Sequence, residues 1–136
     1  MPQVSARTHV VAAITILDTE ATSNSWPVPS DLDCLEIQTP ATMDATSYVT
    51  LEVSPDGGTT WLRFNDDAGA LVSSPVQSTT LPELFTMLAD GVNGYTRGQW
   101  NNIDGVTWLI RIRNADAAGD DEVVGADRVF VAYEKV

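Results

Sequence analysis

The order of apolar and polar residues along this chain is that of short β-strands. Branched or aromatic residues alternate with polar ones over 48–53, 60–64 and 106–113, and such alternation is typical of strands with one buried face. Apolar runs at 10–17 and 128–134 predict two further strands. The pattern therefore favours an all-β protein.

Shorter segments extend this pattern. Strands are also predicted at 34–39 and 70–72. The one plausible helix covers 81–88, where Pro82 and Glu83 suit a first turn and four apolar residues fall on one helical face. A strand or an irregular segment stays open as an alternative there, because two turns make a short helix.

These elements predict one all-β domain. About seven or eight short antiparallel strands, with at most one short helix near 81–88, are typical of a β-sandwich with a jelly-roll or immunoglobulin-like arrangement. The chain shows no internal repeat of about 20–50 residues, the period that marks propellers and solenoids. We expect residues 1–8 to form an extended N-terminal arm and residues 9–136 to form a single sandwich domain.

The turn between 48–53 and 60–64 has a recognisable pattern. Its residues fit S-x-D-x-G-x-T-W, with the fixed positions Ser54, Asp56, Gly58, Thr60 and Trp61. Pro-Asp-Gly-Gly supplies a preset φ, a side chain that caps its own backbone and two residues that accept positive φ, so a β-hairpin is predicted. The pattern resembles the Asp box of sialidases, where it braces a turn and takes no part in catalysis. It occurs once here, so it implies a structural turn only.

Charge narrows the choice of partners. Seven basic residues stand against nineteen acidic ones, a formal net charge of −12. Such a surface repels phosphate backbones and anionic headgroups, so we expect no nucleic-acid or membrane partner. No apolar run approaches the roughly 20 residues of a membrane span. The first residues lack the apolar core of a secretory signal, so we expect no signal-dependent secretion.

Candidate chemistry is sparse. The single histidine, His9, and the single cysteine, Cys34, do not make a catalytic set, and no nucleophile or phosphate-binding motif is present. We therefore predict no catalytic residues, no metal site and no cofactor. The acidic loop 114–122 does not fit EF-hand spacing, which leaves an irregular calcium site open as an alternative.

Three aromatic residues lie in predicted loops: Trp26, Tyr95 and Trp100. Exposed rings there could anchor a protein partner or stack on a sugar. Burial beneath the loop is a third interpretation. The sequence leaves all three open.

One resemblance covers the chain from about residue 8 to residue 133. Its motifs are Val28-Pro29-Ser30-Asp31-Leu32, Ile37-Gln38-Thr39-Pro40-Ala41, Val49 to Thr60, Leu109-Ile110-Arg111-Ile112-Arg113-Asn114 and Ala126-Asp127-Arg128-Val129-Phe130-Val131. Their succession resembles the layout of small β-rich virion structural proteins of tailed bacteriophages. The segment 89–105 has no counterpart in that layout.

The resemblance implies a non-enzymatic capsid decoration or cement protein that bridges capsomers. It further implies a major capsid protein or other virion protein as partner, a homo-oligomer with a trimer favoured, and a location in the virion after assembly in the host cytoplasm. Contacts are then expected from Trp26, Tyr95, Arg97 and Trp100, and from residues 2–8 as an arm added to a neighbour's sheet. A tail, neck or fibre-base component and a carbohydrate-binding module are the alternatives.

Overall fold

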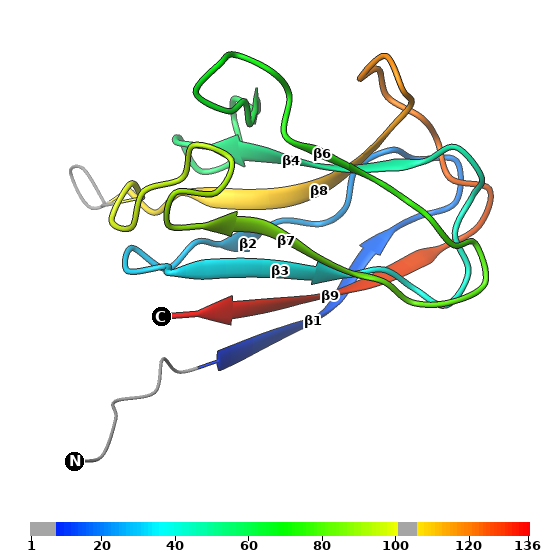
Figure 1. Ribbon diagram of the computed structural model, residues 1–136, viewed down its shortest axis with the longest axis horizontal. Coiled ribbons are helices and arrows are strands. Elements are labelled where there is room, and N and C mark those ends of the chain that lie inside the picture. Colours follow the sequence, from blue (N-terminus) through cyan, green and yellow to red (C-terminus); the bar gives the residue numbers. More distant parts are fainter. Residues whose placement is uncertain (1–7, 101–105) are drawn as a thin grey trace.

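The fold is a β-sandwich of two antiparallel sheets (Figure 1). The structure, a computed structural model, describes residues 8–100 and 106–136. Its strands are β1 (Thr8–Ile16), β2 (Trp26–Pro27), β3 (Cys34–Gln38), β4 (Tyr48–Ser54), β5 (Leu62–Arg63), β6 (Ser73–Pro75), β7 (Leu84–Ala89), β8 (Leu109–Ala115) and β9 (Arg128–Lys135). The all-β sandwich predicted from the sequence is confirmed.

Strands distant in the sequence pair within each sheet. The order is β1-β9-β3-β7 in the four-stranded sheet and β2-β8-β4-β5 in the five-stranded sheet, where β6 also pairs with β4. The first strand of the chain therefore pairs with the last. Figure 1 shows β1, β9 and β3 side by side, with β4 and β8 in the other layer. Most backbone pairs in the two sheets therefore join residues that are far apart in the sequence.

Alternation along the central strands builds the core. On β9, Phe130 and Ala132 are fully buried, and Val131 between them is only half-buried. The five-stranded sheet contributes its own apolar set, and the buried branched residues of its two long strands are Val49, Leu51, Val53, Ile110 and Ile112. The inner faces of the two sheets meet in one apolar cluster, as expected for stacked sheets.

Of the alternatives that the sequence left open over 81–88, the structure has the strand and not the short helix. Leu84–Ala89 is β7, which pairs antiparallel with β3 along its whole length. Glu83, assigned to a first helical turn, instead accepts hydrogen bonds from the backbone N–H groups of Gln77 (2.8 Å) and Ser78 (2.7 Å). A two-turn helix gains little by itself, whereas the ladder to β3 satisfies the backbone and buries Met87 and Leu88.

Other predicted strands differ in their limits. The strand predicted at 60–64 is only Leu62–Arg63, and 70–72 holds an isolated bridge between Asn65 and Leu71 in place of a strand. The next strand starts after it, at β6. Alternation at 106–113 is taken up by β8, which starts three residues later and continues to Ala115. Of the predicted arm over 1–8, only Thr8 lies within the described residues, as the first residue of β1.

Candidate functional site

The Asp-box turn is braced by its own side chains. Ser54 Oγ donates to Asp56 Oδ1 and accepts from the Gly58 N–H, both at 2.8 Å. The Thr60 N–H also donates to Asp56 Oδ1, at 2.8 Å. These bonds hold the pKa of Asp56 below its ordinary value, chiefly through the Thr60 backbone N–H. The arrangement matches the structural turn that the sequence pattern indicates.

Behind this turn an arginine joins the hairpin to β8. The guanidinium of Arg111 lies 4.1 Å from the centroid of the Trp61 ring, within cation–π distance. Its Nη2 donates to Glu52 Oε1 at 2.7 Å. Glu52 and Arg111 are directly opposite in the β4–β8 ladder, so the pairing follows from the register. Trp61 is thus partly buried as a structural residue.

Three of the four residues expected at an interface are core residues. Trp26, Tyr95 and Trp100 are 6%, 1% and 2% exposed. Trp100 packs among other rings, with its centroid 5.1 Å from that of Trp108 and 5.9 Å from that of Phe64. The expectation that these three side chains are exposed contacts is therefore wrong.

The loop carrying Tyr95 folds back over one end of the sandwich. The Tyr95 hydroxyl donates to the Leu32 carbonyl oxygen, and burial raises the pKa of this tyrosine to about 12. Arg97, two residues later, is exposed. Of the four expected contact residues, the three aromatic ones are therefore buried, and Arg97 is on the surface. An apolar ring in a loop gives no local signal that separates burial from exposure.

Two carboxylates of the acidic loop at 114–122 are engaged within the chain. Asp116 Oδ1 accepts from the N–H groups of Ala118 (2.9 Å) and Asp120 (3.0 Å), and Asp121 Oδ1 accepts from Arg113 Nη1 at 2.8 Å. Among residues 8–100 and 106–136, no group of three or more His, Cys, Asp or Glu side chains is placed to hold a metal ion. No helix of the described chain is long and apolar enough to cross a membrane.

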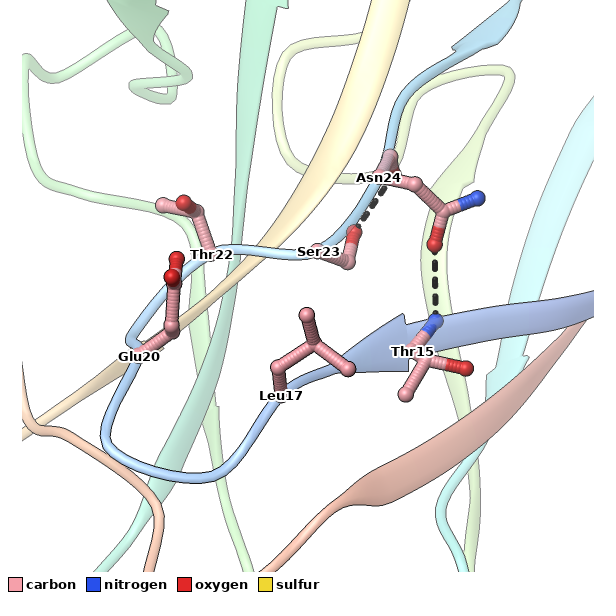
Figure 2. Close-up of a pocket in the computed structure, with 6 residues that line it drawn as sticks. All are labelled: Thr15, Leu17, Glu20, Thr22, Ser23 and Asn24. Atoms are coloured by element: carbon pink, nitrogen blue, oxygen red, sulfur yellow. Dashed lines mark hydrogen bonds between the residues drawn. The ribbon is translucent and has the colours of Figure 1, made fainter.

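A shallow pocket opens at the C-terminal end of β1. It has a volume of about 350 Å³ and is lined by Thr15, Leu17, Glu20, Thr22, Ser23 and Asn24. Figure 2 shows the carboxylate of Glu20 and the hydroxyl of Thr22 on one side and Leu17 beneath them. Asn24 and Ser23 are engaged within the chain, since Asn24 Oδ1 accepts from the Thr15 N–H and Ser23 Oγ accepts from the Ile112 N–H.

One lining residue of this pocket and one residue of a segment bonded to it are exposed and apolar. Leu17 is 55% exposed and Val123 is 60% exposed. Their segments are joined by backbone hydrogen bonds, from the Thr19 N–H to the Val124 carbonyl and from the Val124 N–H to the Glu20 carbonyl. We call the pocket together with Leu17 and Val123 the β1-end patch. It combines methyl groups with a surface carboxylate, a combination that suits the apolar stem and charged end of a lysine or arginine.

Two buried charged residues were not singled out from the sequence. Arg113 is fully buried beneath the 116–121 loop, with its Nη1 on the Gly119 carbonyl at 3.0 Å. Glu134 is 4% exposed, and Trp26 Nε1 donates to its Oε2 at 3.3 Å. Burial raises the pKa of Glu134. Alternation along β9 was a usable signal, because Glu134 is in phase with the buried Phe130 and Ala132.

No protein-family model matches the sequence, and no curated protein matches it significantly.

Proposed function

We propose that this chain is a non-enzymatic structural protein of a bacteriophage virion, most simply a capsid decoration protein that bridges neighbouring capsomers. The observation that carries the proposal is the succession of strand and turn motifs quoted above. In the folded chain these motifs lead into β3, leave it, and run through β4, β8 and β9, the central strands of the two sheets. The motifs therefore cover or flank the central strands of the sandwich. A resemblance in fold has to involve these strands.

The β1-end patch is the surface that we assign to the capsid partner. It lies at the end of β1 remote from the C-terminal end of β9 (Figure 1). Its Glu20 and the net charge of −12 favour a partner that offers basic side chains. Leu17 and Val123 would add apolar contact once water is excluded. The mechanism is mechanical: each copy joins two capsomers and resists their separation.

Two experiments test this proposal. Gold-labelled antibody against the chain is applied to purified particles of the phage that encodes it. Labelling over heads is expected, labelling confined to tails or necks would favour that alternative, and unlabelled particles would overturn the proposal. Purified protein is then bound to capsids that lack it, with Leu17→Asp expected to bind at least tenfold more weakly. Leu81→Asp is the matched control, because Leu81 is 65% exposed and lies outside the patch.

A sugar-binding function loses its main support. Tyr95 and Trp100 are buried, so their faces are closed to a pyranose ring. Tryptophan emission that stays constant over a panel of oligosaccharides is the expected result.

A further inference from the structure

The outer edge of β1 is closed along one half and open along the other. At the C-terminal half, Asn24 Oδ1 accepts from the Thr15 N–H at 2.8 Å, and Ile16 bridges to Ser23. Toward the N-terminus, β9 is the only one of the described strands that pairs with β1. Within the described residues, the backbone groups of 8–12 make no hydrogen bond outside that ladder. Unpaired edge groups of this kind are templates for a further strand.

The open stretch has one of the usual edge protections, a bulge at its end, and lacks the others. Lysine, proline and inward charges commonly blunt sheet edges, and Thr8-His9-Val10-Val11-Ala12 contains none of them. A bulge between Val11 and Ile14, with Ala13 at φ 60°, ends the regular part of the strand. Ala12 and Ala13 lie in the bulge, so the regular part of the open edge is limited to 8–11. Val10, within this regular part, is 59% exposed.

Charge points to a second copy of this chain as the partner at this edge. Two copies with a net charge of −12 repel one another over most of their surface. Residues 8–17 contain no Asp, Glu, Lys or Arg, so the edge of β1 is a neutral strip on an acidic molecule. Two such strips can meet without bringing carboxylates together.

We propose that two copies associate through antiparallel pairing of their β1 edges, centred on Val10 and using the regular residues 9–11. Antiparallel overlap of residues 9–11 with the same residues of a second copy places Val10 of each copy opposite Val10 of the other, on a twofold axis. The two four-stranded sheets then form one continuous sheet. Such a contact is smaller than the roughly 1,200 Å² of stable interfaces, so the dimer should dissociate on dilution. This inference does not rest on the virion role.

Disulfide trapping tests the register. In a Cys34→Ser background, Val10→Cys places two thiols at directly opposite positions. Opposed Cα atoms in antiparallel strands are about 4.5–5.5 Å apart, within the range that a disulfide spans. A covalent dimer should form at least tenfold faster than with Val129→Cys. Val129 is the matched control because it is 49% exposed on β9, one strand in from the edge.

Sedimentation equilibrium of the purified chain measures how strongly two copies associate. The wild type should dimerise with rising concentration, and more readily in salt because salt screens the repulsion between the acidic copies. Val10→Lys should be monomeric, since it opposes two like charges, whereas Val129→Lys should still dimerise. Thermal unfolding should be similar for both variants, because both sites are exposed. Equal cross-linking rates for Val10→Cys and Val129→Cys, or a wild type that stays monomeric, would overturn the proposal without affecting the capsid-binding experiment.

Discussion

Replacing Glu134 with glutamine should stabilise the protein at neutral pH. Glu134 is 4% exposed as a residue, and its carboxylate receives one long hydrogen bond, 3.3 Å from Trp26 Nε1. Desolvation therefore disfavours its charged form and raises its pKa, with the Trp26 hydrogen bond acting in the opposite direction. Glutamine keeps an acceptor for the indole N–H and removes the buried charge.

The sign of the pH dependence follows from this raised pKa. The folded state holds the Glu134 proton more tightly than the unfolded state, so folding is favoured at low pH. This contribution is fully present below the ordinary value of 4.5 and is lost as pH rises through the raised pKa. Across that window the free energy of unfolding falls by up to about 1.4 kcal/mol per pH unit. Above it, we expect Glu134→Gln to be more stable than the wild type by about 1–2 kcal/mol, or about 3–8 °C in Tm.

Chemical denaturation of both proteins from pH 4 to pH 8 measures the effect. The two free energies of unfolding should converge at the acidic end and separate as pH rises. Glu20→Gln is the charge-matched control, since Glu20 is exposed, and should differ little from the wild type at every pH. His9 lies opposite Glu134 in the β1–β9 ladder, so the series is repeated in a His9→Gln background. A difference that is independent of pH, or a less stable Glu134→Gln at pH 7, would refute the reasoning.

Three further changes test other parts of the structure by thermal unfolding. Asp56→Ala should lower Tm at pH 7 relative to the exposed control Asp31→Ala, and the loss should vanish at a pH below the lowered pKa of Asp56, where its carboxylate is protonated. Thr46→Gly should raise stability by about 0.5–1 kcal/mol, because Thr46 has φ 64°, whereas Ala45→Gly should lower it. Trp100→Ala should cost about 3–5 kcal/mol, since the ring is 2% exposed, and an unchanged Tm would contradict its place in the core.

Much of the framework is local and could be predicted from the sequence. Period-two alternation located the long central strands, because a strand with one buried face needs that order of side chains. The Asp-box pattern located the turn between β4 and β5, since the bonds from Ser54, Gly58 and Thr60 all lie within seven residues. The all-β class followed from the same two signals.

The candidate surface could not be predicted in this way. Exposure of a loop aromatic depends on what the loop packs against, and Trp100 is buried because Phe64 and Trp108 meet it from other parts of the chain. The pocket beside Glu20 exists because 20–24 returns along the end of β1. Neither the packing around Trp100 nor the return of 20–24 along β1 can be recognised from the residues of that segment alone.

Amino-acid order is enough to predict the class of fold, the main strands, the braced turn and an acidic surface, because alternation, turn chemistry and charge act between near neighbours or need no structure at all. The tertiary structure makes Leu84–Ala89 a strand, since its backbone pairs with that of β3, 46 to 55 positions away in the sequence. It also decided which half of the β1 edge stays open, because Asn24 reaches only the other half. Pairing between distant residues is a property of the folded chain, and the surfaces proposed here as contacts depend on it.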